Sequence, residues 1–76
     1  MYQDSDYIDD IVKCCSRIVE KTQGRELEEF LEAEDLHDIV VRQFTIIGEA
    51  ARRVSDETKE MYPNIEWYLI VGMRNR

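Results

Sequence analysis

The sequence has few residues that interrupt helices or cross-link the chain, with one proline, three glycines and two cysteines among 76 residues. It shows no secretory signal, anchor motif or long apolar run, so the expected location is a reducing cytoplasm. Cys14 and Cys15 are adjacent, and consecutive side chains of a helix diverge by about 100°. A disulfide between them is therefore not expected, and Cys15 is predicted to be a small core residue.

The residue patterns of common catalytic and metal sites are also missing. There is no glycine-rich phosphate loop, no nucleophile elbow and no paired CxxC motif. His37 is the only histidine, whereas a zinc site needs three or four convergent ligands. We therefore expect neither a metal nor a cofactor, and interpret His37 as a solvated residue near the start of a helix.

Charge is unevenly distributed along this chain of formal net charge -7. Residues 1–38 hold 12 acids and 4 bases, whereas residues 39–76 hold 5 acids and 6 bases. Because phosphate contacts dominate nucleic-acid affinity, a nucleic-acid partner is expected to meet the second half and to be repelled by the first. Arg52 and Arg53 themselves are interpreted as the solvated end of a helix. The candidate contacts are Arg42, Arg52, Arg53, Arg74 and Arg76.

Apolar residues recur every three or four positions along most of the chain, which is typical of amphipathic helices. The pattern predicts a first helix that starts at Asp4 or Ser5 and ends at Gly24, a short helix over 26–34, and a long central helix over 35–54. Ser55 then caps a helix that Pro63 ends, and a final helix starts near Asn64. The predicted inner positions of the first two helices are Ile8, Ile11, Val12, Cys15, Ile18, Val19, Leu27, Phe30 and Leu31.

These elements predict one all-α domain over residues 1–76, because no strand alternation or repeat competes with the helical pattern. A domain of this length buries only roughly 60% of the surface of its unfolded chain. A second copy or a partner protein is therefore expected to cover the remaining apolar surface.

The central helix contains an unusual run of small residues, Gly48-Glu49-Ala50-Ala51. Glycine inside a helix costs about 1 kcal/mol relative to alanine. Close approach of another helix or subunit would offset this cost, and positioning of a ligand is the alternative explanation.

Three blocks of the sequence together resemble one protein family. They are 46–55 (IIGEAARRVS), 62–67 (YPNIEW) and 70–76 (IVGMRNR). In this order and at this spacing they resemble the HepT-like HEPN ribonuclease toxins. The resemblance implies an antiparallel, up-and-down helical bundle that forms a homodimer and acts as a metal-independent endoribonuclease. It also implies control by a cognate nucleotidyltransferase-type (MNT) antitoxin.

Within this resemblance, Arg74 corresponds to the catalytic arginine and Asn75 to the polar residue after it. The family motif continues with a His and a Tyr, which would fall three and five residues beyond Arg76. The resemblance assigns proton transfer to that His and nucleotide acceptance from the antitoxin to that Tyr. We therefore expect a C-terminally shortened domain that is inactive without them.

A second interpretation stays open at this point. The chain could be a non-catalytic helical dimer that binds a nucleotidyltransferase or a nucleotide, as its acidic first half and incomplete motif allow. Glu49 and Arg52 could face the same cleft as Arg74, but spacing alone does not decide this.

Overall fold

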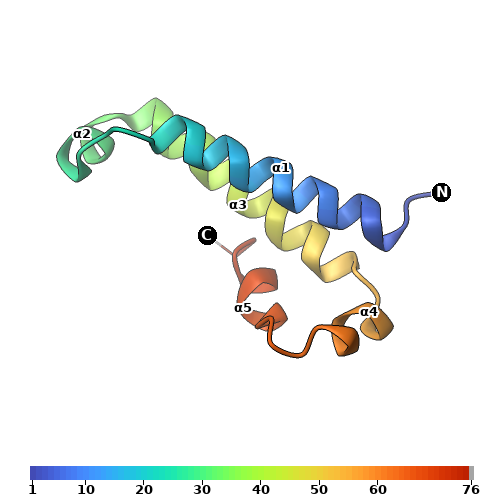
Figure 1. Ribbon diagram of the computed structural model, residues 1–76. Coiled ribbons are helices and arrows are strands. Elements are labelled where there is room, and N and C mark those ends of the chain that lie inside the picture. Colours follow the sequence, from blue (N-terminus) through green and yellow to red (C-terminus); the bar gives the residue numbers. More distant parts are fainter. Residues whose placement is uncertain (76) are drawn as a thin grey trace.

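The protein is all α-helical in its computed structural model, which describes residues 1–75 (Figure 1). The chain forms α1 (Asp4–Thr22), α2 (Leu27–Glu32), α3 (Glu34–Arg53), α4 (Asp56–Met61) and α5 (Trp67–Gly72). The predicted all-α class and helical bundle are confirmed. The final helix starts at Trp67 rather than near Asn64, because residues 62–65 form a turn closed by the Ile65 N–H to the Tyr62 carbonyl.

The two long helices α1 and α3 lie side by side and run in opposite directions, with α2 at one end of the pair and α4 at the other (Figure 1). Gly24 allows the turn after α1, because its φ of 76° lies in the left-handed region that glycine adopts without strain. The core follows one face of α3. Its buried apolar residues are Cys14, Leu36, Val40, Ile47, Ala50, Ala51 and Val54.

The predicted inner face of α1 is wrong in part. Cys15, expected in the core, is exposed, whereas its neighbour Cys14 is buried, and Val12 and Val19 are also exposed. The reason is that α1 packs mainly on the single neighbour α3, so it buries only a narrow stripe. Val12, Cys15 and Val19 lie beside that stripe.

The same reasoning applies to α2, where Leu27 and Leu31 are exposed and only Phe30 turns partly inward. Phe30 packs against His37, with ring centroids 4.6 Å apart. His37 is therefore half-buried, and the expectation of a solvated histidine is wrong.

Asp4 connects the start of α1 to the start of α4. Its carboxylate accepts hydrogen bonds from the Ser55 N–H at 3.0 Å and from the hydroxyls of Ser55 and Thr58. Ser55 is also the N-cap of α4, as predicted, and accepts from the Thr58 N–H. These hydrogen bonds hold the pKa of Asp4 below its ordinary value of 3.8.

Asp4→Asn is expected to lower the melting temperature at neutral pH. Because folding depresses the pKa of Asp4, its contribution is fully present above the unfolded value of 3.8 and is lost as the pH falls through the lower folded value. The melting temperatures of wild type and variant should therefore begin to converge only as the pH falls below 3.8. Asp9→Asn, at an exposed position of α1, is the matched control. An equal loss of melting temperature in both variants would contradict a stabilising role for the hydrogen bonds of Asp4.

The last helix returns along α3, so that the end of α5 comes close to the C-terminal half of α3 (Figure 1). Trp67 is only half-buried and donates its indole N–H to the Tyr62 carbonyl at 3.3 Å. Across residues 1–75, no helix combines the length and the apolar character that crossing a lipid bilayer requires.

Candidate functional site: an arginine cluster around Glu49

Gly48 is the position on α3 against which the end of α5 packs. A Cβ placed on Gly48 would lie 2.5 Å from the backbone nitrogen of Arg74 and 2.9 Å from the carbonyl oxygen of Val71. Both distances are shorter than van der Waals contact, and both involve backbone, which cannot rotate away. Tight packing therefore explains this glycine, and that packing sets the position of Arg74.

Next to Gly48, the carboxylate of Glu49 gathers three guanidinium groups. Its Oε2 accepts a hydrogen bond from Arg74 Nη1 at 2.9 Å. Its Oε1 accepts from Arg52 Nη2 at 3.0 Å and lies 3.7 Å from Arg53 Nε. Glu49, Arg52, Arg53 and Arg74 are called the arginine cluster below.

The cluster is partly open to solvent. The side chains of Arg52, Arg53 and Arg74 are 46%, 53% and 36% exposed. The hydrogen bonds from Arg74 and Arg52 hold the pKa of Glu49 below its ordinary value, so this carboxylate is ionised at neutral pH. One negative charge then faces three positive charges, which leaves the cluster with a net charge of about +2.

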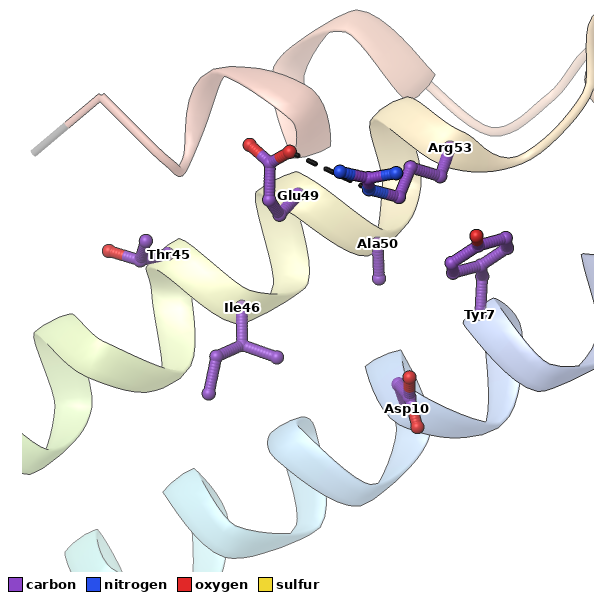
Figure 2. Close-up of a pocket in the computed structure, with 7 residues that line it drawn as sticks. All are labelled: Tyr7, Asp10, Thr45, Ile46, Glu49, Ala50 and Arg53. Carbon is purple, nitrogen blue, oxygen red and sulfur yellow. Dashed lines mark ion pairs between the residues drawn. The ribbon is translucent and has the colours of Figure 1, made fainter. Parts of the chain in front are cut away.

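A shallow hollow between α1 and α3 borders this cluster. It has a volume of about 330 Å³, and Figure 2 shows Ile46 and Ala50 directed from α3 toward α1, whereas Glu49 points toward α5. Asp10 and Tyr7 of α1 line the opposite side. Glu49 therefore meets Arg74 on the α5 side, and together with Arg53 it also lines the hollow, whose α1 side carries the acidic Asp10.

The predicted site residues occupy different settings. Arg74 lies in a turn just after α5, half-buried, and its Nε is enclosed without a hydrogen-bond partner among the described residues. Asn75 follows it and is exposed. Arg76 lies outside the described residues. Within residues 1–75, no three His, Cys, Asp or Glu side chains gather into a set that could hold a metal ion.

The structure also brings together residues that the sequence did not place beside one another. Glu49 and Arg52 do lie beside Arg74, which spacing alone had left open. Arg53, interpreted as part of a solvated helix end, joins them. The spacing of Glu49, Arg52 and Arg53 at i, i+3 and i+4 was the available signal, because such positions share one helix face.

Fold and site together define an all-α protein. In it, the carboxylate of Glu49 on α3 is surrounded by arginines, one of which follows the last helix. The family model described as "HepT-like: Ribonuclease HepT-like" matches residues 11–76. The chain therefore belongs to the HepT-like ribonuclease family.

Similar proteins of known sequence carry ribonuclease names. The chain is 32% identical over 69 residues to "Putative RNase MJ1380" of Methanocaldococcus jannaschii, a match that covers 91% of this chain and 63% of that protein. It is 32% identical over 71 residues to "Probable ribonuclease HepT" of Thermococcus cleftensis, covering 93% and 64% respectively. The chain thus spans somewhat less than two thirds of the length of these relatives. No solved structure matches it significantly.

Proposed function

We propose that this chain is the Arg74-bearing part of an RNA-cleaving toxin of the HepT-like family. The observation that supports this most is the placement of Arg74, whose guanidinium lies at the surface of a cationic cluster in an otherwise acidic protein. A guanidinium can bind two phosphate oxygens at once and stabilise the negative charge that develops on a phosphate during cleavage. Family membership supplies the reaction class.

The proposed reaction is transesterification without a metal ion. The ribose 2′-hydroxyl attacks the adjacent phosphate, the 5′-oxygen of the next nucleotide leaves, and a 2′,3′-cyclic phosphate forms. Arg74 would neutralise charge on the phosphate, and Asn75 would orient the His that follows in the family motif. The 76 residues include neither that motif His nor that motif Tyr, so for these residues the proposal covers RNA binding and charge stabilisation, not proton transfer.

The protein expressed from its complete reading frame is therefore expected to cleave RNA in the presence of EDTA and to leave cyclic phosphate ends. A matched RNA with 2′-deoxy nucleotides should stay intact, because it lacks the attacking hydroxyl. Gel electrophoresis with end-group analysis by mass spectrometry measures both. Cleavage of the deoxy substrate, or activity that depends on a divalent metal, would contradict the proposed mechanism. A complete reading frame without a His-x-Tyr motif shortly after Arg76 would also contradict it.

The same proposal includes a homodimer and an MNT-type nucleotidyltransferase antitoxin as partner. Exposed apolar side chains such as Val12, Val19 and Leu69 support an assembly that covers them. Sedimentation equilibrium should give twice the mass of the monomer, and the antitoxin should co-purify with the dimer and suppress cleavage. If RNA stays intact while a nucleotidyltransferase still co-purifies, the alternative of a non-catalytic binding module is favoured.

A further inference from the structure

The arginine cluster holds more positive charge than contact with a single scissile phosphate requires. Residues 39–75 contain five bases, and three of them, Arg52, Arg53 and Arg74, meet at the one carboxylate of Glu49. Lys59 lies elsewhere, 5.9 Å from the centre of the Trp67 ring. The structure thus concentrates at one place a charge that the sequence distributes over 23 positions, from 52 to 74.

Stability alone does not account for this arrangement. Ion pairs between half-exposed side chains contribute little to folding, because water screens them and the long side chains lose conformational freedom. A single arginine would neutralise Glu49. The second and third add repulsion between like charges, which is unfavourable unless an anion lies beside them.

The donors left over by the ion pairs are suited to phosphate. A guanidinium carries five N–H donors, and Arg52 uses only Nε and Nη2 toward Glu49. Arg74 uses one N–H of Nη1, and its Nε is enclosed, which leaves the second N–H of Nη1 and both N–H groups of Nη2 as donors. Because Arg52 and Arg74 contact different oxygens of one carboxylate, their guanidinium groups lie close together.

We infer that Arg52 and Arg53 extend the Arg74 site into a track that binds the phosphates flanking the one held by Arg74, with single-stranded RNA as the ligand. Glu49 is the positioning residue that keeps the three guanidiniums together. The strand runs over the α5 side of α3, since Asp10 on the α1 side of the hollow would repel phosphate. This inference rests on the proposed function and adds which further residues hold the substrate.

The test measures the salt dependence of binding between the 76-residue chain and a fluorescent 2′-O-methyl RNA, which cannot undergo transesterification. Each phosphate contact contributes roughly 0.7 to the slope of log affinity against log salt for single strands. The double variant Arg52→Gln/Arg53→Gln is therefore expected to lower the slope by about 1.4. A fourfold rise in salt should then weaken wild-type binding about sevenfold more than it weakens binding by the variant.

Arg17→Gln is the matched control, because Arg17 is an exposed arginine of α1 that lies outside the arginine cluster. It should leave the slope unchanged, and circular dichroism melts should show that all variants fold. Equal slopes for wild type and the double variant would contradict the phosphate track, and so would an equal loss of slope in Arg17→Gln. Either result would leave the proposed function standing. Absence of RNA binding by the wild type would instead count against the proposed function itself.

Discussion

Gly48→Ala is expected to destabilise the protein and to remove most of its RNA cleavage, although alanine is the better helix former. The new methyl group would overlap the backbone of Arg74 and Val71, so the end of α5 must move away from α3. Overpacking of this kind costs roughly 1–3 kcal/mol, against a gain of about 1 kcal/mol from helix propensity. The net effect on the free energy of unfolding is thus a loss of up to about 2 kcal/mol.

The effect on cleavage should be larger than the effect on stability. Moving the end of α5 displaces Arg74 from Glu49, and a misplacement of about 1 Å in a catalytic group can cost on the order of 100-fold in rate. Thermal melts and single-turnover cleavage by the protein from its complete reading frame measure the two quantities separately.

Gly72→Ala is the matched control for this substitution. Gly72 is the last residue of α5, and a Cβ placed there would meet no atom within 4 Å. It should therefore be tolerated, or should stabilise the protein by a few tenths of a kcal/mol up to about 1 kcal/mol through the unfolded state. If Gly48→Ala proved as harmless as Gly72→Ala, the close approach of α5 to Gly48 would be refuted.

Arg74→Ala is expected to reduce cleavage by roughly 100- to 1,000-fold, the usual cost of removing one group that stabilises charge in the transition state. Folding should be nearly unaffected, because the Arg74–Glu49 ion pair is partly exposed. Arg74→Lys should restore only part of the rate, since lysine keeps the charge but cannot bind two phosphate oxygens with a planar fork.

Arg25→Ala is the matched control for Arg74→Ala, because it removes an arginine that lies away from the arginine cluster. Arg25 lies between α1 and α2, where its Nε donates to the Lys21 carbonyl at 3.1 Å, and the variant should cleave RNA at the wild-type rate. Unchanged cleavage in Arg74→Ala would remove the basis of the proposed mechanism.

The helices themselves could be predicted from the sequence because their signals are local. Gly24 ends α1 through its backbone conformation, Ser55 caps α4, and Pro63 keeps Tyr62 out of the helical region. Each signal acts within a few residues, so tertiary packing does not override it.

Which side of α1 is buried could not be predicted in the same way. An apolar stripe that includes Cys15 and Val19 suits a helix covered on two sides, whereas α1 packs mainly on α3. The number of neighbours of a helix depends on the assembled fold, and helical periodicity does not encode it.

The site was predictable only in its separate parts. The cost of a glycine inside α3 indicated a close approach at Gly48, and the motif resemblance pointed to Arg74. That these two positions touch depends on the path of residues 54–73 around the end of α3, which no local signal specifies. Arg74 and Glu49 are 25 positions apart in the sequence, and this path brings them into contact.

The most direct test of the arginine cluster as an RNA phosphate site is a titration of the ¹⁵N-labelled chain with 2′-O-methyl RNA, followed through the side-chain Nε–H signals of arginine. The enclosed Nε–H of Arg74 should exchange slowly with water and therefore be visible. Binding is predicted to shift the signals of Arg52, Arg53 and Arg74 and to leave those of Arg17 and Arg25 in place. Shifts confined to Arg17 and Arg25, or RNA binding that moves no signal of the cluster, would contradict the account.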